Sequence, residues 1–369
     1  MTERIVRPAR RLRGTIAVPG DKSISHRAAM LNALADGEAT VHNFLAGEDC
    51  LSTLRVLREL GVESRLDESG DTPVLWIRGV GLHRLAEPSA VLDCGNSGTT
   101  MRLMSGILAG QAFHSVLSGD ASLRTRPMAR VATPLREMGA RIDGREDGRM
   151  APLSIRGGGL HGIRYRVPVA SAQVKSSILL AGLFAEGETI VEEPEATRDH
   201  TERMLAAMGA RIGREGPAVR LTPGGPLAPL SMRIPNDISA AAFWMVAAAV
   251  HPDAELRLTG VGMNPTRTGI VDVLRAMGAD LSVEEERQVA GEPVADIVVR
   301  SSRLHGTRID GERALSAMDE VPALAVAASY AEGETEIRDA SELRVKESDR
   351  IATTVSQLAA LGVSIGEHE

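Results

Sequence analysis

The 369 residues are 43% hydrophobic and 25% charged, a composition typical of a soluble globular protein with more than one core. A net charge of −7 and only 2% aromatic residues argue against nucleic-acid binding, which favours basic faces and stacking rings. No segment is long and apolar enough to cross a bilayer, and Cys50 and Cys94 have neither metal nor redox spacing. We therefore expect two domains, a reducing cytoplasmic location, and no nucleic-acid or membrane partner.

The first polar cluster runs from Asp21 to Arg27 and reads DKSISHR. The largely apolar run 28–34 follows it, which predicts a buried helix that begins within the cluster. A helix start presents unpaired N–H groups, and Lys22 and Arg27 add positive charge there. The cluster therefore predicts a site for phosphate or carboxylate, with a solvated basic turn as the simpler alternative.

Two further clusters follow in the next stretch of chain, CGNSGTTMR at 94–102 and SLRTRP at 122–127. Asn96 lies in a small polar turn before an apolar run, and Gly98 would allow a ligand to approach the backbone closely. Arg126 precedes Pro127, which we expect to be the first residue of a helix, so its guanidinium would lie at a helix start.

The middle of the chain carries SAQVKSS at 171–177 and TRDHTER at 197–203. The first opens an apolar helix with hydroxyl and amide groups suited to a polyol, and in the second we expect Asp199 to be a helix N-cap. His26 and His200 lie in polar clusters, where a lone histidine beside arginine is more often a structural hydrogen-bonding residue than a catalyst. The nine histidines also lack metalloprotease spacing, so we expect no metal.

The last clusters are Asp319-Glu320, before Val321-Pro322, and RVKESDR at 344–350. Lys346, Glu347 and Arg350 have a spacing that would place two cations beside one carboxylate. An ordinary ion-pair set at a helix start would produce the same pattern, so both interpretations stay open.

A repeated unit organises the whole chain. Glycines at 61, 139, 209, 278 and 362 each end a phrase of helical periodicity, about 70 residues apart, and are expected to be C-terminal caps. The phrases ADGEATV, AEGETIV and AEGETEI follow apolar helices, such as those expected at 176–185 and 325–331, which predicts that these helices are buried. Each unit therefore reads as strand, buried helix, strand, amphipathic helix, strand.

Taken in this order, DKSISHR, GNSGTTMRL, RTRPM, SAQVKS, TRDHTERM and RVKESDR resemble the 5-enolpyruvylshikimate-3-phosphate synthase family over nearly the whole chain. The resemblance implies an α/β enolpyruvyl transferase fold, an inside-out α/β barrel of two lobes, with about five of six βαβαββ units present. Lobe I would comprise 1–18 plus 235–369 and lobe II 19–234, with the site in the cleft between them. It also implies a monomer without metal or cofactor that makes 5-enolpyruvylshikimate 3-phosphate from shikimate-3-phosphate and phosphoenolpyruvate, in the shikimate pathway towards chorismate and aromatic amino acids.

The resemblance also implies residue roles. Catalytic groups would be Lys22, Asp319, Lys346 and Glu347. Shikimate-3-phosphate would be held by Lys22, Ser23, Arg27, Ser171, Ala172, Gln173, Arg198, Asp319 and Lys346. Phosphoenolpyruvate would be held by Lys22, Asn96, Gly98, Arg126 and Arg350.

In one respect the chain departs from the family, because a sixth unit with a DHR-type motif and a later lysine does not occur within these 369 residues. We therefore expect an incomplete lobe I with exposed apolar surface near Ile351, Val355 and Leu358. Two alternatives remain: a non-catalytic or inactive truncated form that still binds ligands, and a transferase acting on UDP-N-acetylglucosamine, whose lysine–asparagine opening and loop cysteine are not matched here.

Overall fold

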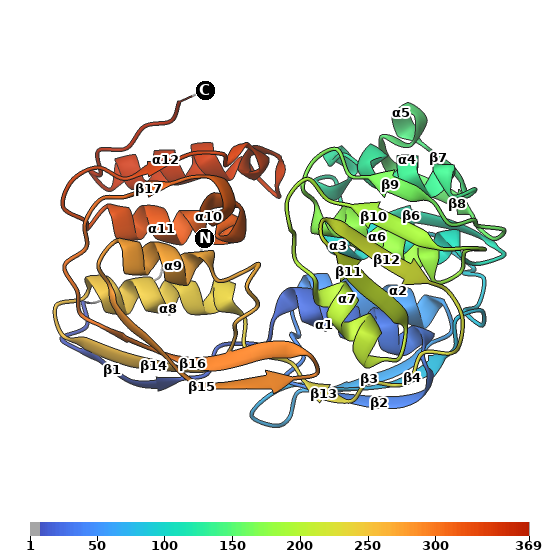
Figure 1. Cartoon of the computed structure of the whole chain (residues 1–369), viewed down its shortest axis with the longest axis horizontal. Coiled ribbons are helices and arrows are strands. Elements are labelled where there is room, and N and C mark those ends of the chain that lie inside the picture. The colour runs from blue at the N-terminus through green and yellow to red at the C-terminus, as the bar shows by residue number, and fades with distance from the viewer. Residues whose placement is uncertain (1–7, 369) are drawn as a thin grey trace. The chain divides into compact units, whose positions relative to one another are not determined.

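The structure is a computed structural model that describes residues 8–368 (Figure 1). The chain forms two compact units: unit 1 contains the residues up to Pro19, Asn236–Arg287 and those from Pro293 on, and unit 2 contains Gly20–Pro235 and Gln288–Glu292. The chain passes between them after Pro19 and after Pro235. Between residues 8 and 368, no helix combines the length and apolar character needed to cross a membrane.

Unit 2 contains three four-stranded sheets of one design, in which the first two strands are parallel and the other pairings antiparallel. The sheet orders are β13 (Met232–Arg233), β2 (Asp36–His42), β4 (Val74–Val80), β3 (Glu63–Asp67); β5 (Leu92–Asp93), β6 (His114–Ser118), β8 (Met150–Arg156), β7 (Arg141–Gly144); and β9 (Arg164–Arg166), β10 (Thr189–Glu192), β12 (Ala218–Thr222), β11 (Arg211–Glu215).

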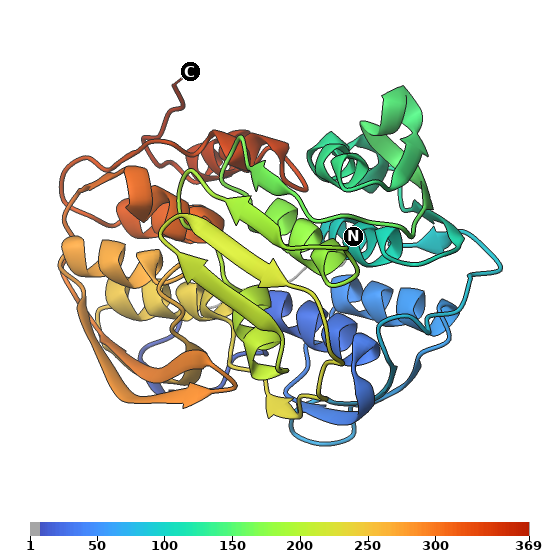
Figure 2. The same ribbon diagram turned by 45° about the vertical axis from the view of Figure 1, so that its right-hand side comes forward.

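The core of unit 2 is built on three buried helices, α1 (Lys22–Leu34), α3 (Gly98–Ala109) and α6 (Ala172–Gly182). These helices are buried nearly all round, so they pack inside while the sheets lie outside them (Figure 1 and Figure 2). The amphipathic helices α2 (Glu48–Glu59), α4 (Ala129–Glu137) and α7 (His200–Ala207) bury one face each. A short helix, α5 (Arg145–Gly148), and a 3₁₀ turn, η1 (Leu123–Thr125), complete unit 2.

Unit 1 repeats the design around α8 (Ile238–Val250), which packs on the sheet β1 (Leu12–Ile16), β14 (Ala254–Gly262), β16 (Glu292–Arg300), β15 (Asp280–Val289). The chain continues through α9 (Gly269–Ala276), β17 (Arg308–Ile309), α10 (Gly311–Ser316), the turn η2 (Met318–Glu320), α11 (Val321–Ala328), β18 (Glu336–Ile337), the turn η3 (Ser341–Val345) and α12 (Arg350–Ala360). The strands β17 and β18 pair in parallel as a two-stranded sheet.

The five expected glycine caps are confirmed. Gly61, Gly139, Gly209, Gly278 and Gly362 follow α2, α4, α7, α9 and α12, and all five have φ between +85° and +109°. A residue with a Cβ atom rarely adopts this left-handed conformation, which is why glycine stands at each helix end.

Side chains cap the opposite ends of α1, α3, α6 and α8. Asp21 accepts a hydrogen bond from the backbone N–H of Ile24 at 2.8 Å, and Ser97, Ser171 and Asp237 cap α3, α6 and α8 in the same way. The clusters DKSISHR, CGNSGTTMR and SAQVKSS therefore lie where buried helices begin, as the sequence indicated for DKSISHR and SAQVKSS.

The prediction that Ile351, Val355 and Leu358 of α12 form an exposed apolar surface is wrong. Leu358 is 8% exposed, and Ile351 and Val355 are half-buried, because α12 packs on α11 and η3 and Ile351 contacts the cluster of Met318, Val321 and Leu343. The burial expected for 325–331 holds only in part, since α11 leaves Val326 37% exposed and Tyr330, just beyond its end, 65% exposed.

Candidate active site

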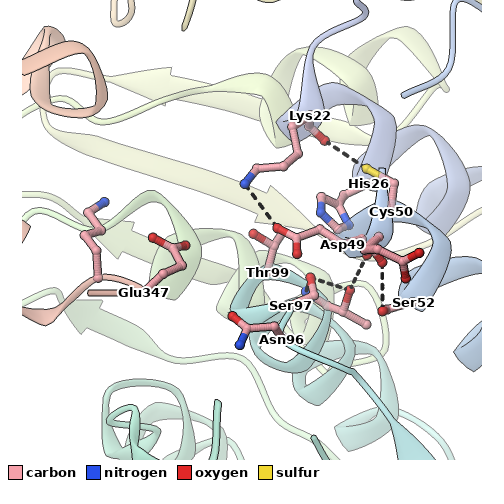
Figure 3. Close-up of polar contacts among 12 residues, drawn as sticks. Lys22, His26, Asp49, Cys50, Ser52, Asn96, Ser97, Thr99 and Glu347 are labelled. Carbon is pink, nitrogen blue, oxygen red and sulfur yellow. Dashed lines mark hydrogen bonds and ion pairs between the residues drawn. The ribbon is translucent and has the colours of Figure 1, made fainter. Parts of the chain in front are cut away.

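Three helix starts meet in unit 2 and bring the first two clusters together (Figure 3). Lys22 begins α1, and its Nζ atom lies 3.1 Å from Oδ2 of Asp49 in the first turn of α2. The two side chains are 45% and 31% exposed, so this ion pair is open to solvent and to a ligand. Asn96 lies directly before Ser97, the N-cap of α3, beside them (Figure 3).

Arg27 is the buried cation of the first cluster. Its guanidinium donates to Oγ1 of Thr201 at 2.7 Å, to Oγ of Ser176 at 2.8 Å and to the carbonyl oxygen of Ser23 at 3.0 Å. Burial and the positive charge of Arg198 lower the pKa of Arg27 to about 10, against the raising effect of the Glu202 carboxylate. Arg198, which directly precedes the N-cap of α7, therefore lies within electrostatic reach of Arg27, and the two charges favour an anion between them.

Asn96 and Arg126 also come together, although they are distant in sequence. The Asn96 amide donates to Oδ2 of Asp120 at 2.6 Å, and its carbonyl oxygen accepts a hydrogen bond from the Arg126 guanidinium. Hydrogen bonds from the backbone of Leu123 and the side chain of Asn96 lower the pKa of Asp120. The expected helix start at Pro127 is wrong, because α4 begins at Ala129 and Arg126 instead ends the turn η1.

Gly98 lies beneath two guanidinium groups. A Cβ atom built on Gly98 would stand 3.0 Å from Nη1 of Arg102 and 3.3 Å from Nη1 of Arg126, closer than side chains normally pack. Arg102 in turn donates to Oε1 of Gln173 at 2.7 Å, and Gln173 donates to Oγ1 of Thr99 at 2.9 Å. The missing side chain of Gly98 thus allows both cations to lie over the start of α3.

Replacing Gly98 with alanine should therefore weaken anion binding at this helix start without unfolding the protein. The methyl group displaces the mobile ends of Arg102 and Arg126 rather than backbone, so the helix accommodates it. We expect the dissociation constant of a phosphate-bearing ligand at this helix start to rise about 10-fold, equivalent to roughly 1.4 kcal/mol. Calorimetric titration of the wild type and the variant with inorganic phosphate measures this, and an unchanged dissociation constant would contradict it.

The start of α6 presents Ser171, Ala172 and Gln173 in succession. Ser171 is the N-cap, with its Oγ atom 3.4 Å from the N–H of Val174, and all three residues are half-buried. Below them Lys175 is completely buried, with its Nζ atom 3.0 Å from Glu193 and 2.7 Å from Glu202. Lys175 also donates to the carbonyl oxygen of Thr197 at 3.3 Å, next to Arg198, so it fixes the loop before α7.

Asp199, the predicted N-cap, and the two histidines of the clusters, His26 and His200, all form side-chain hydrogen bonds. Asp199 is the N-cap residue of α7, but its carboxylate accepts from Nε of Arg203 at 2.8 Å and makes no capping bond to the backbone. Nδ1 of His26 lies 2.7 Å from Oγ1 of Thr53, and Nδ1 of His200 lies 2.7 Å from Oε1 of Glu292. Both histidines are buried and engaged in hydrogen bonds, in line with the structural role expected for them.

Unit 1 brings the remaining predicted residues into one ion-pair network. Oδ1 of Asp319 lies 3.4 Å from Nζ of Lys346 and 3.2 Å from Nη1 of Arg350. Arg350, the first residue of α12, also pairs with Glu347 at 2.6 Å. The two cations therefore share Asp319, and Arg350 joins Asp319 to Glu347.

A buried network lies behind this group. Glu320, next to Asp319 in η2, is 2% exposed, and one of its oxygens accepts a hydrogen bond from Oγ of Ser239 and lies 3.4 Å from the Arg267 guanidinium. Ser239 belongs to the first turn of α8. Glu320 thus anchors η2 to α8 and sets the direction of Asp319.

None of the predicted site residues lines either of two hollows in unit 2. A cavity of about 430 Å³ is lined by residues such as His83, Arg84 and Phe184, and none of the predicted site residues lines it. A second of about 300 Å³ borders Gly95 and Asp120, the neighbours of Asn96. Across residues 8–368, no three His, Cys, Asp or Glu side chains are arranged to hold a metal ion.

Comparison with known structures first gives the class. The structure superposes on the enolpyruvyl transferase NikO from Streptomyces tendae with a TM-score of 0.71 at 18% identity, over 89% of this chain and 75% of that chain, which shows the fold alone. With an EPSP synthase from Acinetobacter baumannii the TM-score is 0.84 at 52% identity, over 94% of this chain and 78% of that one. The protein therefore has the two-lobed α/β enolpyruvyl transferase fold.

The sequence then gives the family. Residues 6–369 match the family model for EPSP synthase (3-phosphoshikimate 1-carboxyvinyltransferase). The chain is 60% identical over 362 residues to a 3-phosphoshikimate 1-carboxyvinyltransferase from Desulforudis audaxviator, covering 98% of this chain and 84% of the relative. For the enzyme of the same name from Desulfitobacterium hafniense (strain DSM 10664 / DCB-2) the identity is 57%, over 98% and 82%. The chain belongs to the EPSP synthase family of transferases.

Three polar residues of these networks were not predicted from the sequence. Asp49 pairs with Lys22, Arg102 bonds Gln173, and Lys175 supports the loop that carries Arg198. Arg102 could have been found, because it lies four positions after Gly98 on one face of the predicted helix. The sequence offered no comparable signal for Asp49, since an acidic residue in a first helical turn is common.

Proposed function

We propose that the protein transfers the enolpyruvyl group of phosphoenolpyruvate to the 5-hydroxyl of shikimate-3-phosphate and releases phosphate. The main support is an ion-pair network: the Arg350 guanidinium pairs with the carboxylates of Asp319 and Glu347, and Lys346 pairs with Asp319. The family match and the curated relatives of the same name support this reaction over a transferase acting on UDP-N-acetylglucosamine.

We assign substrate binding mainly to unit 2, which we propose to be lobe II of the family fold. Lys22, Asn96, Gly98 and Arg126 bind phosphoenolpyruvate, because the helix start and the guanidinium group favour phosphate and carboxylate oxygens. The sugar-like substrate is bound by Lys22 and by Ser23, Arg27, Ser171, Ala172, Gln173 and Arg198, which provide two cations for its phosphate and hydroxyl and amide groups for its ring.

We assign proton transfer to unit 1, proposed as lobe I. Asp319 and Lys346 hold the 5-hydroxyl of shikimate-3-phosphate, and Asp319 assists its deprotonation. Glu347 delivers a proton to the methylene carbon of phosphoenolpyruvate and later removes one. Arg350 binds phosphoenolpyruvate. It also pairs with both Asp319 and Glu347, and so holds the two carboxylates at separate positions for their different roles.

The reaction uses these proton-transfer groups and cations in successive steps. Protonation of the methylene carbon makes the adjacent carbon electrophilic, and the 5-hydroxyl oxygen attacks it to give a tetrahedral intermediate. Loss of phosphate and of one methyl proton then restores the double bond. Cations at the departing phosphate stabilise its developing charge, which explains the lysines and arginines in a protein of net charge −7.

Phosphate release from the two substrates together, with each omitted in turn, tests the proposal. Release that requires both substrates is the expected result. Shikimate-3-phosphate binding by calorimetry with no release would instead favour the non-catalytic alternative, and release with UDP-N-acetylglucosamine as acceptor would favour the other transferase.

We also propose that the enzyme acts as a monomer in the cytoplasm without a metal or organic cofactor. Two buried thiols, Cys50 and Cys94, support a reducing compartment. Burial raises the pKa of the Cys94 thiol, which keeps it protonated and unreactive. Sedimentation of the purified protein with and without both substrates tests the monomer.

A further inference from the structure

In unit 2, hydrogen bonds connect four buried side chains and so link the helices α1, α2 and α3. Nδ1 of His26 on α1 lies 2.7 Å from Oγ1 of Thr53 on α2, and Thr53 lies 2.7 Å from Oγ1 of Thr100 on α3. Thr100 donates to Oγ of Ser97, the N-cap of α3, at 2.8 Å. None of the four has measurable exposure, so water does not compete for these bonds (Figure 3 labels His26 and Ser97).

The hydrogen bond from Thr100 to Ser97, and the lack of an acceptor for Nε2 of His26 among the described residues, favour one direction for these hydrogen bonds. The Thr100 hydroxyl has one hydrogen, which points to Oγ of Ser97 or to the carbonyl oxygen of Asp49 at 3.3 Å. Towards Thr53 it can then only accept, so Thr53 must use its single hydrogen on Thr100. His26 is left to donate to Thr53, which requires the neutral ring with its proton on Nδ1.

The surroundings of His26 agree with a neutral ring. Burial, together with the positive charges of Lys22 and Arg27, lowers the pKa of His26 to about 3. Nε2 of His26 is buried and has no hydrogen-bond partner among the described residues, so a proton there would have no acceptor. His26 therefore carries no charge at neutral pH and contributes through one donated hydrogen bond.

We propose that His26 is a positioning residue that, through Thr53 and Thr100, holds the start of α3 in fixed register with the start of α1. Lys22 begins α1, while Asn96 and Gly98 lie at the start of α3. The inference rests on the proposed function of these three residues at the phosphoenolpyruvate site. It assigns a role to three buried polar residues that no step of the reaction uses.

Breaking these hydrogen bonds should affect the binding of the two substrates unequally. The start of α3 carries Asn96 and Gly98 for phosphoenolpyruvate, whereas shikimate-3-phosphate depends largely on α6 and on Arg198. A shift of the α3 start therefore affects the first substrate more than the second. We expect Thr53→Val and Thr100→Val each to raise the KM for phosphoenolpyruvate about 10-fold, with the KM for shikimate-3-phosphate within about 2-fold.

Matched variants separate this role from mere packing. Thr53→Ser keeps the hydroxyl and should restore the KM, and the double variant Thr53→Val/Thr100→Val should be no worse than either single one, because each already breaks these hydrogen bonds. Ser105→Ala removes another buried hydroxyl of α3, which bonds only to its own helix at Met101, and should leave both KM values unchanged.

Nuclear magnetic resonance tests the direction of these hydrogen bonds without an activity measurement. In protein labelled with ¹⁵N-histidine, His26 should show a protonated Nδ1 and an unprotonated Nε2 from pH 5 to 8, and its resonances should be identified by their loss in His26→Gln. A proton on Nε2, or titration within this range, would overturn the proposal, as would valine variants that raise both KM values equally. If wild-type protein released no phosphate, the proposed function would fail while the ring measurement still decided this inference.

Discussion

Replacing Lys175 with methionine is expected to lower the free energy of unfolding by about 3–5 kcal/mol. The change leaves Glu193 and Glu202 in the interior after removing a cation 3.0 Å and 2.7 Å from their carboxylates. The carbonyl oxygen of Thr197 also loses its donor. Urea unfolding of the variant beside the wild type measures the loss.

The loss should grow with pH, and the sign follows from Glu202. Burial already raises the pKa of Glu202 against the lowering effect of Lys175, so removing Lys175 raises it further. A carboxyl whose pKa is higher when folded favours folding below its unfolded pKa, and this contribution disappears as the pH rises through the folded pKa. Lys175→Met should therefore be less destabilised at pH 5 than at pH 8.

An exposed ion pair on the same unit provides the control. Arg220 pairs with Glu188 and Glu215 on the surface of the sheet, and Arg220→Met should change stability far less than Lys175→Met at either pH. Equal losses in the two variants, or a loss independent of pH, would show that Lys175 does not neutralise a buried carboxylate.

Replacing Glu347 with glutamine is expected to lower kcat about 10²–10⁴-fold, because the amide keeps the shape of the side chain but cannot give or take a proton. The ion pair with Arg350 at 2.6 Å becomes a hydrogen bond from the charged guanidinium to a neutral amide oxygen, so the network around Asp319 stays in place. Binding of shikimate-3-phosphate should remain within about 3-fold of wild type, since that substrate depends on other residues. Phosphate release and calorimetry on the same preparation measure both quantities.

Glu334→Gln makes the same chemical change at an exposed position before β18 and should leave kcat unaffected. If Glu347→Gln retained more than half of the wild-type kcat, proton transfer would have to be assigned elsewhere, with Asp319 as the remaining carboxylate of the network.

The sequence predicted those parts of the fold that depend on local conformation. The glycine phrases identified the helix ends because a left-handed φ is a property of one residue. The clusters at DKSISHR and SAQVKSS were correctly placed at helix starts because a capping side chain lies beside the turn it caps. The family resemblance then supplied candidate roles that neither local rule could give.

Features that depend on distant partners were not predicted. Arg126 was expected at a helix start from Pro127 alone, whereas its position is set by Asn96, 30 residues earlier. Lys175 looked like part of a polar cluster, yet it is buried because two glutamates from later segments surround it. Local periodicity also placed α12 correctly, but it could not show that η3 and α11 cover one side of it.

Both units pair strands that lie far apart in the sequence, and this has a consequence for synthesis on the ribosome. The strand β1 is made first, yet its partner is β14, with Leu12 paired to Ala254. At about 5–20 residues per second the intervening chain takes roughly 12–50 s to make, and for that time β1 has no partner from its own sheet. Meanwhile β2 awaits β13, which pairs Val41 with Met232, so neither unit completes its sheets until more than half of the chain has been translated. The arginines at positions 11 and 13 give the waiting strand a charged edge that discourages pairing with other nascent chains.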